Sequence, residues 1–187
     1  MADNPNQQKL KKFKAIIRQL ESSDGKNLNH APVASGLNKG QQAGGAYGIL
    51  PNTLNNFVAS GKNKGELIDP RLDAMSKLPP EVVTQILNED RELDDKAADL
   101  GMGQVLPRAD WDEEKAAYGW NTGHNRDYKN LSPEYKDFDY VQKYRKLAEE
   151  MPVEDPGAIS LSPKAPVNDG IFNRLKRLLG APSNGQK

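Results

Sequence analysis

An apolar stripe with helical spacing near the start of the chain most constrains its fold. Four large apolar residues recur at positions i, i+3, i+4 and i+7, namely Phe13, Ile16, Ile17 and Leu20. This spacing places them on one face of an amphipathic helix, which we expect to run from about Gln8 to Ser23. The polar run that follows stops the helix, and Gly25 is suited to cap its C-terminal end.

The same spacing recurs along the chain and predicts an all-α protein. Apolar residues stand at helical intervals in four further segments, at residues 50–58, 80–105, 110–120 and 133–150. Pro51 and Pro80 suit the first turn of a helix, Thr53 suits a cap, and Asp110 with Glu113 resembles a capping box. Alternation of apolar and polar residues over several positions is absent from the sequence, so we expect no strand.

The last of these segments carries a clear apolar face. We expect its buried side to consist of Phe138, Val141, Tyr144, Leu147 and Ala148. The chain then divides into a polar tail over residues 1–12, one folded domain over 13–150, a proline-rich linker over 151–170, and a basic amphipathic helix with its tail over 171–187.

Composition excludes several classes of function. The 187 residues carry 26 basic and 26 acidic side chains, so no basic excess exists to neutralise phosphates, and nucleic acid is not the expected partner. The chain has no cysteine and two histidines, which excludes disulfides, thiolate metal sites and cysteine nucleophiles and argues against a stable metal site. The N-terminal residues lack a secretory signal, so we expect the protein to be made in the cytoplasm.

Glu21 is the first candidate for chemistry. It ends the first predicted helix four residues after Ile17, at the edge of the apolar stripe. Apolar neighbours and the negative end of the helix dipole should both raise the pKa of its carboxyl group. A carboxylic acid with a raised pKa suits general-acid catalysis at neutral pH. The alternative interpretation is a solvated glutamate at a helix end.

Four motifs in order resemble the lytic transglycosylase branch of the lysozyme-like superfamily, and most of all its phage-encoded members. They are the pair Glu21-Ser22 at the end of an apolar helix, GAYGILPNT at residues 45–53, AAYGWNTGHN at residues 116–125, and YVQKY at residues 140–144. The likeness covers residues 10–150. Two departures stand out, because Ile49-Leu50 replaces a glutamine that the family often carries, and Gly119 interrupts the third motif before Asn121.

The resemblance implies a lysozyme-like catalytic domain that cleaves the β-1,4 bond between N-acetylmuramic acid and N-acetylglucosamine in peptidoglycan. Glu21 would act alone, first as the acid and then as the base, and the product would be a 1,6-anhydro sugar without any cofactor. Tyr140 would point its hydroxyl at Glu21. The resemblance gives substrate contacts to six residues: Ser22, Tyr47, Tyr118, Trp120, Asn121 and Tyr140.

Other interpretations compete with this one. Ser22 can serve only to shape the helix end, and the tyrosines can be core aromatics with a polar tip. Asp24 is a candidate second carboxylate that would make the protein a hydrolytic muramidase, although at a helix end aspartate is more often a turn residue. His30 and His124 lie in predicted loops and receive no catalytic role.

A cell-wall substrate lies outside the cytoplasm, so the protein needs a route to it. A phage virion that carries the protein, and opens the periplasmic cell wall during DNA entry, provides one, with residues 151–187 contacting other virion proteins. A holin-dependent endolysin is the alternative. Two further interpretations are a catalytically degenerate structural protein of a virion and a carrier for a membrane-surface or partner-binding helix at residues 171–187.

Overall fold

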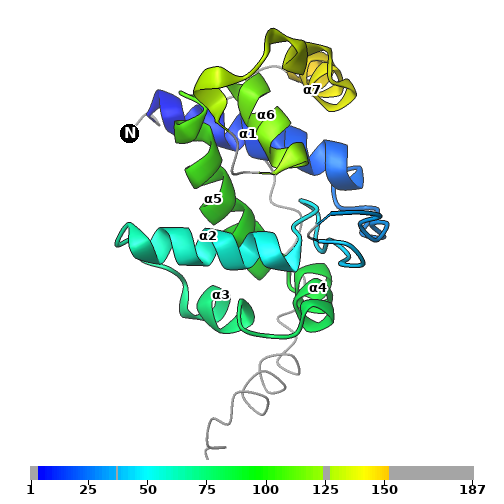
Figure 1. Ribbon diagram of the computed structural model, residues 1–187, viewed down its shortest axis with the longest axis vertical. Coiled ribbons are helices and arrows are strands. Elements are labelled where there is room, and N and C mark those ends of the chain that lie inside the picture. Colours follow the sequence, from blue (N-terminus) through cyan, green and yellow to red (C-terminus); the bar gives the residue numbers. More distant parts are fainter. Residues whose placement is uncertain (1–3, 37, 124–126, 152–187) are drawn as a thin grey trace, which may run out of the picture.

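Seven α-helices and two short 3₁₀ helices make up the described part of the chain in the computed structural model, which covers residues 4–36, 38–123 and 127–151 (Figure 1). They are α1 (Pro5–Ser22), α2 (Pro51–Asn63), α3 (Pro70–Met75), α4 (Pro80–Glu89), α5 (Arg91–Arg108), α6 (Glu113–Thr122), η1 (Tyr128–Asn130), η2 (Pro133–Asp137) and α7 (Asp139–Glu150). Within those ranges the only extended pairing is a bridge between Gly44 and Ile49. The all-α prediction is therefore confirmed.

Helix α5 forms the centre of the fold. It contacts α1, α2, α3, α4 and α6, and Figure 1 shows α1, α6 and α7 gathered around one end of it and α2, α3 and α4 around the other. Its buried apolar residues are Leu93, Ala97, Ala98, Met102, Val105 and Leu106. Because this helix is covered on several sides, its apolar residues do not form a single stripe.

Helix α1 buries the predicted stripe. Phe13, Ile16 and Ile17 have no exposed surface, and Leu20 packs against the same core. Helix α7 crosses α1 and α6, and the ring of Tyr144 lies 5.6 Å from the ring of Phe13. Burial of these large side chains, worth about 1.5–3 kcal/mol each, holds the C-terminal turn of α1 in place.

The start of α1 differs from the prediction. The helix begins at Pro5, three residues before the predicted start at Gln8, so most of the predicted polar tail is helical. The reason is local, because proline suits the first helical position and the side chain of Asn4 accepts a hydrogen bond from the amide of Asn6.

Two predicted caps are wrong. Asp112, not Asp110, caps α6 by accepting from the amide of Lys115, while Asp110 lies in a turn with a φ of +53°. Helix α2 begins at Pro51 without any side-chain cap, so Thr53 has no such role. The two-residue shift from Asp110 to Asp112 follows because several polar residues near a helix start can all accept such a bond.

The predicted helical segment from residue 80 to 105 is two helices. They separate at Asp90, whose extended backbone ends α4 and whose side chain caps α5 by accepting from the amide of Leu93. Helix α3 was not predicted. It has six residues, too few for a period to show, and it starts with Asp69 as cap and Pro70 in the first turn.

The predicted helix at residues 133–150 is also interrupted. A 3₁₀ helix ends at Asp137 and α7 begins at Asp139, with an extended residue, Phe138, between them. Phe138 is 39% exposed, so its assignment to the buried face is wrong, whereas Val141 and Tyr144 are buried as expected.

The predicted linker after Met151 and the predicted helix at residues 171–187 lie outside the described residues. Among the helices that are described, none combines the length and the apolar character needed to cross a membrane.

Candidate active site

Glu21 lies in the last turn of α1, where the helix ends and the chain turns into a long irregular loop. Ser22 is buried, donates to the carbonyl of Arg18 at 2.9 Å and accepts from the amide of Gly25 at 2.7 Å. Ser23 follows in the left-handed conformation. The role of Ser22 is therefore to close the helix, and the expectation that it contacts substrate is corrected, because its hydroxyl is buried and already bonded on both sides.

Tyr140 meets Glu21 from the first turn of α7. Its hydroxyl donates to Oε1 of Glu21 at 2.6 Å, which confirms the predicted contact between the first and the fourth motif. A phenol that donates to one carboxyl oxygen fixes the orientation of the group and leaves the proton of the acid to the other oxygen.

The second motif covers the other side of the same carboxyl group. Gly48 has a φ of +64°, and a Cβ atom added to it would lie 2.6 Å from Oε2 of Glu21. Only glycine permits both this backbone conformation and this approach. Sequence reasoning did not single out Gly48, although its position after Tyr47 in a glycine-rich motif was a signal for a close backbone approach.

The turn that carries Gly48 is held by bonds at several points. Gly44 and Ile49 exchange two backbone hydrogen bonds, of 2.9 and 3.0 Å. The amide of Gly45 donates to Asn88 on α4, and the amide of Ala46 donates to Asp94 on α5, both at 2.8 Å. Helices α4 and α5 thus fix the turn that lies against the acid.

Burial is the main influence on the pKa of Glu21. The side chain is half-buried, and this loss of solvation raises the pKa of the carboxyl group above its usual value, while the Tyr140 hydrogen bond and the charge of His30 lower the pKa in part. The predicted direction is therefore confirmed. Burial, together with the neighbouring Glu21 carboxyl, raises the pKa of the Tyr140 phenol well above its usual value, so Tyr140 remains a donor.

Asp94 is a second buried acid below the turn. It is 2% exposed, its Oδ2 accepts from Ala46, and its Oδ1 has no hydrogen-bond partner among the described residues. Burial raises the pKa of this carboxyl to about 7. Sequence reasoning missed Asp94, because an aspartate in a charged stretch of helix carries no signal of burial.

Tyr47 is not placed to contact a sugar, which corrects another prediction. It is 2% exposed, its ring lies under Lys14 and its hydroxyl donates to Asp95 on α5. The hydrogen bond and the burial both favour the neutral phenol, with a raised pKa. Tyr47 therefore anchors the Gly44–Ile49 turn to the interior.

Trp120 holds the same turn from α6. Its indole nitrogen donates to the carbonyl of Tyr47 at 3.2 Å, and its ring stacks on Phe57 with centroids 6.0 Å apart. One face of the half-buried indole is thus used in packing, and stacking on a sugar stays a prediction.

Tyr118 and Asn121 lie on α6 near its C-terminal end. Tyr118 is half-buried with its ring against those of Tyr135 and Phe138, the latter at 5.4 Å edge to face. Asn121 is exposed in the last turn. Their substrate contacts stay predictions, and the exposed ring of Phe138 adds an aromatic surface that the sequence placed in the core.

Asp24 does not face Glu21 as a partner acid. It has a φ of +62°, and its carboxylate pairs with Arg18 at 3.3 Å while Arg18 also donates to its carbonyl. These are the contacts of a turn residue at a helix end, in agreement with the structural interpretation of Asp24. In the described part of the chain, no three His, Asp or Glu side chains gather as metal ligands.

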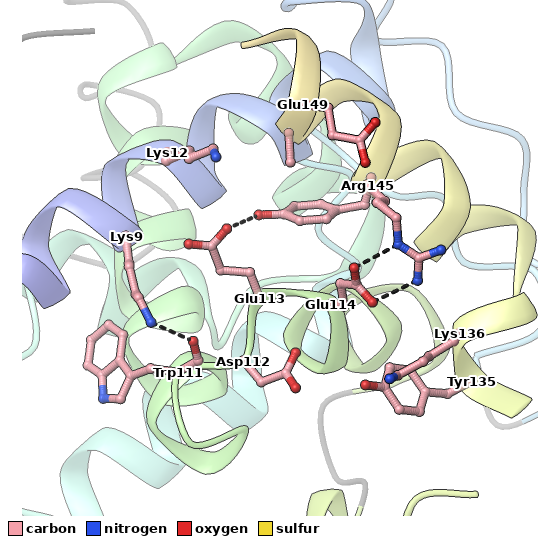
Figure 2. A pocket seen from close by; sticks show the side chains of 12 residues that line it. Lys9, Lys12, Trp111, Asp112, Glu113, Glu114, Tyr135, Lys136, Arg145 and Glu149 are labelled. Carbon is pink, nitrogen blue, oxygen red and sulfur yellow. Dashed lines mark hydrogen bonds and ion pairs between the residues drawn. The ribbon is translucent and has the colours of Figure 1, made fainter. Parts of the chain in front are cut away.

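A groove of about 470 Å³ lies elsewhere, between the first half of α1, the start of α6 and α7. Figure 2 shows Arg145 with two hydrogen bonds to Glu114 in this groove. Tyr144 donates to Glu113. Glu21 does not line this groove. The charged residues of the groove stabilise the packing of α6 on α7 and do not converge on a common point.

Comparisons with protein-family models, with curated proteins and with solved structures gave no significant match to this chain.

Proposed function

We propose that the protein is a peptidoglycan lytic transglycosylase that uses Glu21 as its single catalytic acid and base. The observation that carries the proposal is the meeting of three separate motifs at one carboxyl group. Glu21 ends α1, Tyr140 donates to its Oε1 from α7, and Gly48 lies against its Oε2 from the glycine turn. Burial raises the pKa of the group that these contacts orient.

The chemistry follows from this arrangement. Because Tyr140 occupies Oε1, the proton of the acid resides on Oε2 and is donated to the glycosidic oxygen as the C1–O bond breaks. The resulting carboxylate then takes the proton of the muramic acid C6 hydroxyl, and the C6 oxygen bonds to C1. The balance gives a 1,6-anhydro product with no water consumed and Glu21 protonated again.

A muramidase is the second candidate, because hydrolysis needs only a water in place of the C6 hydroxyl and a second carboxylate to activate it. The pairing of Asp24 with Arg18 favours the single-acid mechanism, since it occupies the acid nearest to Glu21 in sequence. Carriage in a phage virion, with residues 151–187 as a tether, remains part of the proposal. The matching context for a hydrolase is a holin-dependent endolysin.

The test is digestion of purified peptidoglycan by the wild type and by Glu21→Gln, with mass spectrometry of the products. Glutamine keeps the size of the side chain and cannot donate the acid proton. Anhydro-muropeptides from the wild type alone are the expected result. Reducing-end products, one water heavier, would identify a hydrolase, and no products from either protein beside an active control enzyme would favour a structural role.

A further inference from the structure

His30 lies in the loop after α1 and is fixed in two ways. Its Nε2 lies 2.8 Å from the carbonyl oxygen of Gly45, and its own carbonyl accepts from the side chain of Gln42 at 2.7 Å. Because a carbonyl oxygen only accepts, Nε2 carries a hydrogen and donates it. A charge on this ring therefore arises by protonation of Nδ1, with the bond to Gly45 unchanged.

The residue that His30 binds belongs to the turn over the acid. Gly45 directly follows Gly44, which pairs with Ile49 through two backbone hydrogen bonds, and three residues later Gly48 lies against Oε2 of Glu21. The Gly44–Ile49 turn is thus held by His30 from its loop as well as by α4 and α5. Its charge also acts on Glu21, because it favours the ionised carboxylate.

We propose that His30 is a positioning residue of the Glu21 site, which fixes the Gly44–Ile49 turn through its hydrogen bond to Gly45 and acts on the carboxyl group through its charge. This inference rests on the proposed function for its catalytic meaning. The titratable groups that act on Glu21 are Tyr140 from α7 and His30 from the loop, whereas Gly48 contributes only backbone. Tyr140 stays neutral, so among these groups His30 is the one whose charge acts on the carboxyl group.

Two substitutions separate the two roles. His30→Gln keeps an N–H donor for Gly45 and removes the charge, whereas His30→Ala removes both. We expect His30→Gln to retain most of the activity on peptidoglycan at the optimum while its high-pH limb moves to higher pH, because the acid keeps its proton longer. His30→Ala should show this shift together with a loss of about tenfold or more in rate, because the turn is released.

The measurement that decides is a ¹³C NMR titration of the Glu21 carboxyl carbon in glutamate-labelled full-length protein, assigned by its disappearance in Glu21→Gln. We expect the Glu21 inflection in His30→Gln at higher pH than in the wild type, because the variant lacks the charge that lowers the pKa of the carboxyl group. Asn29→Ala, exposed and one position earlier in the loop, is the control and should titrate like the wild type.

A Glu21 inflection at the same pH in the wild type and in His30→Gln would overturn the proposal, even if the enzyme is active. The expected titration in a protein without activity on peptidoglycan would leave the coupling of His30 to Glu21 intact and refute the proposed function alone. His30→Gln keeps a donor for Gly45, so its comparison with the wild type decides the question even if His30→Ala does not fold.

Discussion

The hydroxyl of Tyr140 donates to Oε1 of Glu21 at 2.6 Å, although 119 positions separate the two residues in the chain. The contact joins the last turn of α1 to the first turn of α7, two helices whose packing is fixed by Phe13 and Tyr144. A hydrogen bond of this length to a carboxyl oxygen lowers the pKa of the acid, because it stabilises the charged carboxylate more than the neutral acid.

Tyr140→Phe should therefore raise the pKa of Glu21 further and lower the rate. The substitution removes the hydroxyl that stabilises the carboxylate and orients it, so we expect the high-pH limb of the activity profile to move to higher pH. Loss of one bond to a charged group, about 1.5 kcal/mol, corresponds to roughly a tenfold fall in kcat. Activity on peptidoglycan measured as a function of pH checks both effects.

Tyr144→Phe is the matched control on the same helix. Its hydroxyl donates to Glu113 at 2.8 Å, at the groove and not at Glu21. We expect it to lower stability by about 1 kcal/mol and to leave the pH profile unchanged. Equal profiles for the two variants would mean that the Tyr140 bond has no influence on the acid.

Glu21→Gln should stabilise the folded protein while it abolishes activity. The folded-state pKa of Glu21 is raised by burial, so the folded protein holds this proton more tightly than the unfolded chain and loses stability as pH rises above about 4. Glutamine cannot ionise and escapes this loss. Urea unfolding at about pH 4 and about pH 8 should show a stability advantage of the variant that grows with pH.

Asp24→Asn provides the comparison for that series, because Asp24 is exposed and lies three residues away. The free energy of unfolding of Asp24→Asn minus that of the wild type should not increase as pH rises. An advantage of Glu21→Gln that is constant or shrinks with pH would contradict a raised pKa for Glu21 and remove its main qualification as a general acid.

The helices were predictable because their signals are local. The stripe that includes Phe13 and Ile17 follows from spacing alone, and so do the buried positions Val141 and Tyr144. Boundaries were less predictable, since Asp110 and Asp112 are equally good caps by sequence and only the backbone turn at residue 110 decides between them. Helix α3 is shorter than two periods of its own pattern and left no signal.

The surroundings of the acid were predictable only in part. Glu21 was a candidate because it ends an apolar helix, and its contact with Tyr140 was implied by the family resemblance. Tyr47 was misassigned because its partner, Asp95, is 48 positions away and no local pattern indicates that a tyrosine in a glycine-rich turn faces inward. Asp94 was missed for the same reason, because its burial results from packing between distant segments.

Gly48→Ala should reduce activity by more than its effect on stability explains. Alanine at a φ of +64° costs about 1 kcal/mol or more in backbone strain, and its Cβ would displace Oε2 of Glu21. We expect a loss of at least about tenfold in the rate on peptidoglycan, since a small displacement of a catalytic group has effects of this size. The rate is measured at a temperature well below unfolding of the variant.

Gly40→Ala measures the effect of backbone strain without a steric clash. Gly40 has a φ of +83° and no neighbouring atom within 4 Å in the described structure, so the variant carries the strain without the clash. It should lower stability by a similar amount and keep its activity. A similar loss of activity in both variants would show that contact with Glu21 is not the reason for glycine at position 48.

Two glycines on α5 should respond to alanine in opposite directions. A Cβ at Gly101 would overlap the ring of Phe57, which is buried and stacked on Trp120, whereas Gly103 is exposed with open space around it. We expect Gly101→Ala to destabilise by about 1–3 kcal/mol and Gly103→Ala to stabilise by about 0.5–1 kcal/mol. Urea denaturation measures both, and equal effects would contradict the packing of α2 on α5.

Asp94→Asn should change how stability depends on pH, because Asp94 holds the turn over the acid with a buried carboxyl group. Its pKa is raised from 3.8 to about 7, so the folded state binds the proton more tightly and the wild type loses stability as pH rises between these values. At about 1.4 kcal/mol for each unit, the loss is on the order of 4 kcal/mol at most.

Asparagine keeps an acceptor for the amide of Ala46 and cannot ionise, so the variant lacks this loss. The free energy of unfolding of the wild type minus that of Asp94→Asn should fall steadily from about pH 4 to about pH 7. Asp99→Asn, exposed on the same helix and paired with Lys14, should show no such trend. A constant difference for Asp94→Asn would mean that the carboxyl is already ionised in the folded protein at low pH, with Ala46 and the turn above it held by a permanent charge.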